Sequence, residues 1–191
     1  YKVYGPHYSL LYGKKEHLQE LPGINHFFIG EDDIPYKLQP GNVNYELSYS
    51  LRGVIDYLET VYDHHWDEET GFKEKMKAVF DLFAEQEEKL ATLLLEFLKT
   101  KKNTKIIGES ASSKNVRVPT VSFIVDGVNS NKIPVKVDKH KIAIRYGDFY
   151  ARRLIESLGL LERDGVIRVS MVHYNTVEEV KALIKVLDQI L

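Results

Sequence analysis

Residues 164–191, DGVIRVSMVHYNTVEEVKALIKVLDQIL, decide the fold class because a strand pattern and a helix pattern follow each other within them. The Asp-Gly pair leads into the apolar-rich run Val166–Val172, which is typical of a strand. Thr176 and Glu179 then have the spacing of a capping box, and apolar residues recur at helical spacing behind them. This stretch therefore predicts a mixed α/β chain that ends in a helix.

The same two patterns extend toward the N-terminus. Strands are predicted at Lys105–Gly108, Val118–Val125 and Ile142–Arg145, with a buried strand at Tyr8–Tyr12. Helices are predicted at Glu16–Leu21, from Tyr45 to the His64-His65-Trp66 stretch, at Phe72–Lys99 and at Tyr150–Leu158. Because short β-rich runs begin only after the long helix, we expect a domain boundary near its start, giving domains 1–72 and 73–191.

Composition excludes several classes of protein. The chain has 26 Lys and Arg against 28 Asp and Glu, so it has no global positive field for nucleic acid or an anionic membrane. No apolar run reaches the ~20 residues of a membrane span, and no charged-then-apolar leader precedes Tyr1, so we expect a cytoplasmic protein. There are 0 cysteines, which rules out a disulfide framework or a cysteine nucleophile in this chain. The histidines share no ligand spacing, so no metal site is expected.

Three candidate sites emerge from the residues themselves. Lys2 lies between aromatic residues and just before a Gly-Pro pair, where a lysine is either a solvated surface charge or a desolvated nucleophile. Arg145 and Arg168 each follow β-branched residues, a placement that suits binding of a carboxylate or a structural ion pair. The Pro40-Gly41-Asn42 turn could bind an anion through its backbone or be an ordinary turn. Residue type alone does not choose between these alternatives.

Five motifs, taken in order, resemble one enzyme family over nearly the whole chain. The chain resembles the class V aminotransferases and cysteine desulfurases, which depend on pyridoxal 5'-phosphate (PLP), and within them the cysteine desulfurase-like proteins. The resemblance implies the aspartate-aminotransferase-type fold, with 1–72 as the end of the large PLP-binding domain and 73–191 as the small C-terminal α+β domain. It also implies a C-terminal fragment that starts at the PLP lysine and is inactive alone. The motifs are Tyr1–His7 with Leu11–Gly13, Gln39–Glu46, Val118–Phe123, Ile142–Gly147, and Ile167–Ser170 with His173–Val180.

The resemblance also assigns roles to individual residues. It implies that Lys2 forms the Schiff base with PLP and that Arg168, ahead of Arg145, binds the carboxylate of an amino-acid substrate. Gly41 and Asn42 stand where typical members have Gly-Thr, which reaches the cofactor phosphate of the partner subunit in a homodimer. Here the Asn42 amide replaces the threonine hydroxyl and can still donate a hydrogen bond.

One departure from the family pattern concerns the sulfur chemistry. Tyr150 occupies the position of the loop cysteine that accepts sulfur in desulfurases, and a phenol cannot carry a persulfide. We therefore expect an aminotransferase or a lyase and not a true cysteine desulfurase. The alternative is a non-catalytic scaffold or regulatory protein that retains the fold, although such a protein would need neither Lys2 nor Arg168.

Overall fold

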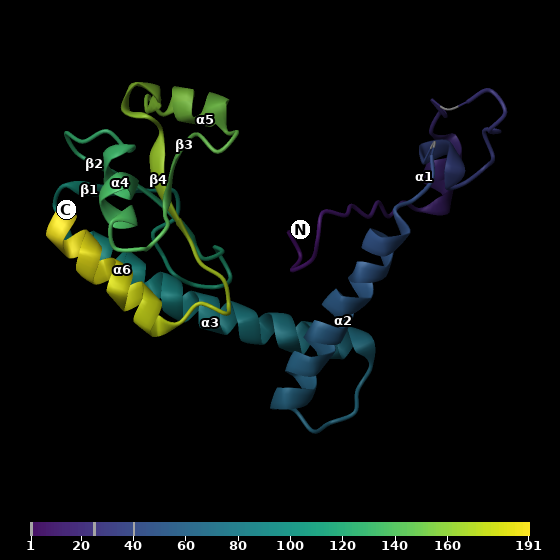
Figure 1. The fold of residues 1–191 in the computed structure, drawn as a ribbon, viewed down its shortest axis with the longest axis horizontal. Coiled ribbons are helices and arrows are strands. Elements are labelled where there is room, and N and C mark those ends of the chain that lie inside the picture. Colours follow the sequence, from purple (N-terminus) through teal and green to yellow (C-terminus); the bar gives the residue numbers. More distant parts are fainter. Residues whose placement is uncertain (1, 25, 40) are drawn as a thin grey trace. The chain divides into compact units, whose positions relative to one another are not determined.

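The computed structural model describes residues 2–24, 26–39 and 41–191, which form two compact units, Tyr1–Met76 and Lys77–Leu191 (Figure 1). Each unit is described by itself. The long helix α3, Phe72–Thr100, begins in the first unit and continues through the second. The assignment of 1–72 and 73–191 to the large and small domains of a whole enzyme stays a prediction.

The second unit is built on a four-stranded antiparallel sheet in the order β1-β2-β4-β3. Its strands are β1 Thr104–Ile107, β2 Thr120–Val125, β3 Arg145–Gly147 and β4 Val166–Ser170. Besides α3, its helices are α4 Lys132–Asp138, α5 Arg152–Ser157, the 3-10 turn η2 Leu161–Arg163 and α6 Val177–Ile190. The predicted mixed α/β fold is thus confirmed.

The two faces of this sheet bury different amounts of apolar surface. Alternate residues of a strand point to opposite faces, and Val121, Phe123 and Val125 of β2 all lie in the main core with α3, α4 and α6. Figure 1 shows α6 running along α3 on this side. The opposite face has a smaller cluster, in which Ile155 of α5 packs against Ile124 and Val166. The main core fixes the sheet, so the second face is free to position polar side chains.

The capping box predicted for α6 is present. The Thr176 hydroxyl accepts the Glu179 N–H at 3.1 Å, and the Glu179 carboxylate accepts the Thr176 N–H at 2.8 Å. The bond from the Thr176 N–H, followed by one from the Asn175 side chain, holds the pKa of Glu179 below its ordinary value. Local side-chain chemistry therefore determines where this helix begins.

One strand prediction in the second unit needs correction, and one helix was not predicted. The strand predicted at Ile142–Arg145 begins only at Arg145, because the ladder to β4 pairs Arg145 with Arg168 and Gly147 with Val166. Ile144 lies buried in the core just before it. Helix α4 was missed by the sequence analysis, and it contains Pro134. Pro134 lies in the first turn of α4, where a missing N–H costs no helical hydrogen bond.

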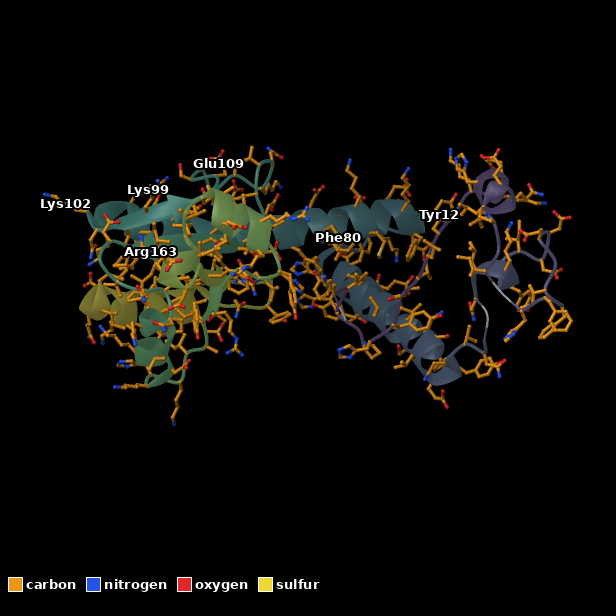
Figure 2. All side chains as sticks on the ribbon, turned by 90° about the horizontal axis from the view of Figure 1, so that it is seen from above. Tyr12, Phe80, Lys99, Lys102, Glu109 and Arg163 are labelled. Atoms are coloured by element: carbon orange, nitrogen blue, oxygen red, sulfur yellow. The ribbon has the colours of Figure 1, made fainter. Side chains whose placement is uncertain are left out.

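The first unit consists of α1 Lys15–Glu20, the 3-10 turn η1 Tyr36–Leu38 and α2 Tyr45–His65. The predicted buried strand at Tyr8–Tyr12 is wrong: the segment pairs with no strand, and Tyr12 is 80% exposed (Figure 2). A strand needs a neighbouring backbone for its hydrogen bonds, and none of the described residues of this unit lies in a strand. None of the helices in the described part of the chain has the length and hydropathy needed to cross a membrane.

Candidate functional site

The segment that contains Lys2 runs along helix α2. The Tyr4 ring meets the edge of the Tyr57 ring with centroids 6.1 Å apart, and the Tyr8 hydroxyl is hydrogen-bonded to the Ser48 hydroxyl at 3.0 Å. Between these contacts, Gly5 lies so close to α2 that an added Cβ would be 3.1 Å from a Val54 methyl group. The segment is therefore antiparallel to α2, with Lys2 toward the C-terminal half of the helix.

A cavity of about 710 Å³ lies beside Lys2. It is lined by most of the segment from Lys2 to Leu10 and by Leu51 and Val54 of α2. Its volume falls within the range of small-molecule and cofactor sites. Lys2 itself is exposed, so its amine can reach a ligand bound there.

Gly41 and Asn42 lie before the other end of the same helix. Both are exposed, whereas Pro40 of the predicted turn lies outside the described residues. The Asn44 side chain accepts the Leu47 N–H at 2.8 Å and caps the start of α2. At 1.5 Å per residue, Tyr45 and Tyr57 are roughly 18 Å apart along the helix. The structure therefore does not bring Asn42 close to Lys2 within one chain.

The two predicted arginines are direct neighbours in the sheet of the second unit. Arg145 of β3 pairs with Arg168 of β4, and Arg168 pairs with Ser122 of β2, so all three side chains share one face. Like charges placed opposite each other destabilise a sheet unless an anion compensates them. No carboxylate among the described residues forms a salt bridge with either arginine.

Arg168 is held by an aromatic ring instead of an acid. Its guanidinium carbon lies 3.8 Å from the centre of the Phe149 ring, and its buried Nε has no hydrogen-bond partner among the described residues. An aromatic face attracts a guanidinium and leaves the edge of its planar fork open to a carboxylate. Arg145, by contrast, is exposed.

The loop that carries Phe149 has an unusual backbone. Phe149 and Tyr150 both adopt positive φ angles, 52° and 64°, which non-glycine residues rarely do. Asp148 stabilises the loop, because its side chain accepts the Tyr150 N–H at 3.0 Å and its carbonyl accepts the Ala151 N–H at 2.8 Å. Tyr150, the residue predicted to stand at the desulfurase cysteine position, is fully exposed. Sequence reasoning missed Phe149, since no local pattern marks an aromatic residue that packs on an arginine of another strand.

Comparison with known proteins decides the family. The family model of Aminotransferase class-V matches residues 1–183. This chain belongs to the class V aminotransferase family. The predicted resemblance is thereby confirmed, and the family consists of PLP-dependent enzymes.

Relatives of the family agree with this assignment. The chain is 41% identical over 192 residues to the Aminotransferase-like protein FGM3 of Gibberella zeae, covering 100% of the chain and 44% of that protein. It is 32% identical to the Cysteine desulfurase-like protein ustD of Aspergillus flavus, covering 100% of the chain and 40% of that protein. The chain thus spans less than half the length of these relatives.

A solved structure shows the same fold. The cysteine desulfurase CsdA of Escherichia coli matches with a TM-score of 0.69 and 24% identity, over 98% of this chain and 43% of that one. The chain therefore has part of the fold of a PLP-dependent class V enzyme. The roles of Lys2, Gly41, Asn42, Arg145 and Arg168 stay predictions.

Proposed function

We propose that this chain supplies the PLP lysine and the substrate-carboxylate arginine of an enzyme that acts on an amino acid. The observation that carries the proposal is the state of Arg168, a half-buried guanidinium that stacks on an aromatic ring and forms no salt bridge with any of the described residues. A structural arginine at this depth would normally be paired, because burial of an uncompensated charge is costly. A substrate carboxylate would complete the site through two parallel hydrogen bonds.

The Lys2 amine and the cavity beside it fit PLP. Lys2 supplies a primary amine beside a cavity large enough for the cofactor and would bind it covalently through Nζ. When bound, PLP supplies the electron sink for bond cleavage at the α-carbon of an amino acid. In this proposal the freed Lys2 amine removes the α-proton, while Arg168 fixes the carboxylate.

The proposed enzyme is a homodimer in which Asn42 serves the partner's cofactor. The position of Asn42 at the opposite end of α2 from Lys2 supports this role, because one chain does not place both residues at the same cofactor. The exposed Asn42 amide can donate to a phosphate oxygen.

Within the family, we propose amino transfer or a lyase reaction and not thiol-based desulfuration by this chain. It has 0 cysteines, and Tyr150 stands at the predicted cysteine position. Amino transfer and lyase chemistry share the same first step at the α-carbon, so Lys2 and Arg168 support both.

A spectroscopic experiment tests this proposal. The whole protein, loaded with PLP, should show a visible absorption band that requires Lys2 and shifts when its amino-acid substrate is added from a panel. Lys2→Ala should abolish the band, whereas Lys14→Ala, at an exposed lysine of the same unit, should leave it unchanged. Arg168→Gln should keep the band and raise the KM for the amino acid at least about thirtyfold. A band that persists in Lys2→Ala would favour the non-catalytic scaffold.

A further inference from the structure

We infer that the second unit also selects the substrate side chain and prefers an amino acid with an apolar side chain of about the size of leucine. This inference rests on the proposed function, because it assumes that Arg168 binds the α-carboxylate. It adds a second binding element, an apolar cavity directly beside that arginine.

The cavity has a volume of about 430 Å³ and lies over the second face of the sheet. Arg168 and Phe149 both belong to its wall, and among the described residues Ser122 and Asp148 are its other polar side chains. The rest of the wall is mainly apolar and comes from β1, β4 and the α5 region, with Ile107, Val166, Leu154, Ile155 and Leu158. Such a cavity offers an apolar ligand a place away from water and a charged ligand little compensation.

One row of paired residues crosses all four strands, and the chemistry of its side chains changes from one edge of the sheet to the other. Ile107 of β1 pairs with Ser122, Ser122 with Arg168, and Arg168 with Arg145. Paired residues share a face, so the row changes from apolar at β1 to cationic at β4 and β3. Neighbouring strands are about 4.8 Å apart, which places Ile107 about 10 Å from Arg168 across the sheet. A carboxylate on Arg168 with an apolar tail toward Ile107 matches this order.

The charges around the cavity favour one carboxylate and not two. Asp148 is the only acid among the described residues of its wall, and this carboxylate already accepts the Tyr150 N–H and lies 3.8 Å from Arg152. Arg168 is therefore left for a ligand carboxylate. A second carboxylate on the ligand tail would enter the apolar part and lose its hydration without a new partner.

Phe149 links the two binding elements, because its ring both contacts the Arg168 guanidinium and lines the cavity. Its backbone is held in the left-handed region together with that of Tyr150. Strained backbone of this kind persists where surrounding contacts enforce it, and it is concentrated at ligand-binding sites. The loop therefore positions the arginine and one wall of the cavity together.

The test measures binding of simple carboxylates to the full 191-residue chain without PLP. The Arg168 Nε–H resonance of the labelled chain is followed by NMR during titration with acetate, 4-methylpentanoate or succinate. Each buried methylene strengthens binding roughly fourfold, so 4-methylpentanoate should bind at least about tenfold more tightly than acetate. Succinate should bind more weakly than 4-methylpentanoate. Equal affinities, tighter binding of succinate, or no binding of any probe would overturn the inference.

Variants of the chain show where the apolar tail of the bound carboxylate lies. They also test this inference independently of the proposed function. Leu158→Gln places a polar group in the cavity wall at a residue that is 46% exposed, so the unit should still fold. It should weaken binding of 4-methylpentanoate about fivefold or more and leave acetate unchanged. Val135→Gln, at a 58% exposed residue outside the cavity, is the matched control and should change neither. The titrations contain no PLP, so this binding can be found or lost whatever the PLP experiment shows.

Discussion

The two units of the chain differ sharply in how much of their conformation they secure with their own residues. The second unit buries a continuous core between its sheet and helices α3, α4 and α6. Among the described residues of the first unit, only Lys37, Leu58 and Tyr62 are buried, and the Lys37 ammonium is held by the Gln19 carbonyl at 3.0 Å. An apolar sequence pattern therefore produces a core in one unit and an exposed surface in the other.

The same residue type illustrates the difference. Phe123 of β2 is 0% exposed, whereas Phe27 of the first unit is 100% exposed. Residues 1–72 are predicted to belong to a larger PLP-binding domain, whose other parts would cover these apolar side chains. Pairs of matched variants, with one change in each unit, can break or sharpen this comparison.

The largest difference is expected from removal of a phenylalanine ring. Phe123→Ala should lower the free energy of unfolding by about 3–5 kcal/mol, since it removes a fully buried ring and leaves a cavity. Phe27→Ala should change it by less than about 0.5 kcal/mol. Urea denaturation followed by circular dichroism measures both. Similar losses in the two variants would mean that the units do not differ in this way.

A smaller difference is expected from adding one methyl group to a glycine. Gly165 has a φ of +72°, and a Cβ there would lie 2.3 Å from the Gly147 carbonyl oxygen, which is backbone and cannot move away cheaply. Gly165→Ala should therefore cost about 2–4 kcal/mol. Gly41→Ala, where a Cβ would meet nothing within 4 Å, should be nearly neutral. Thermal unfolding of the two variants checks this, and equal melting temperatures would contradict the close approach.

The sequence predicted the elements whose signals are local. Helices α2, α3 and α6 have long apolar stripes, and α6 also has its capping box, so they were placed within a residue or two. The Tyr8–Tyr12 strand failed because a strand depends on a partner that may lie far away in the chain, and an apolar run does not specify one. Helix α4 was missed for a different reason, because its 7 residues are too few to show a clear helical repeat.

The candidate site was predictable only through the family resemblance. Arginines after β-branched residues fit an ion pair as well as a ligand site, and only the strand register shows that Arg145 and Arg168 lie side by side. The contact between Phe149 and Arg168 joins a loop to another strand, so it depends on tertiary structure alone. The apolar cavity depends in the same way on the packing of α5 against the sheet.

Removal of a helix cap should produce a smaller difference in stability between the two units. Thr176→Ala removes the cap of α6, which packs in the main core, and should lower the free energy of unfolding by about 1 kcal/mol. Asn44→Ala removes the cap of α2 in the first unit, and its effect should be confined to fraying of the first turn. Hydrogen exchange at the Leu47 amide, which donates to Asn44, should then speed up while exchange in the sheet stays unchanged. Faster exchange in β2 or β4 of Asn44→Ala would show that the two units unfold together.

The smallest effect concerns pH and belongs to the second unit. The His173 ring stacks on Phe83 with centroids 3.6 Å apart, and burial lowers the pKa of His173 below its ordinary value of 6.5. The unfolded chain therefore binds more protons between the folded pKa of His173 and pH 6.5, so stability should fall as the pH drops through this window.

Glu87 acts in the opposite direction. Its carboxylate accepts the His173 backbone N–H, and burial raises the pKa of this carboxyl above 4.5, so its protonation stabilises the fold on acidification. Melting temperatures at several pH values should thus fall less steeply with acid in His173→Gln and more steeply in Glu87→Gln than in the unaltered chain. Identical slopes in all three proteins would mean that neither group titrates differently in the folded state.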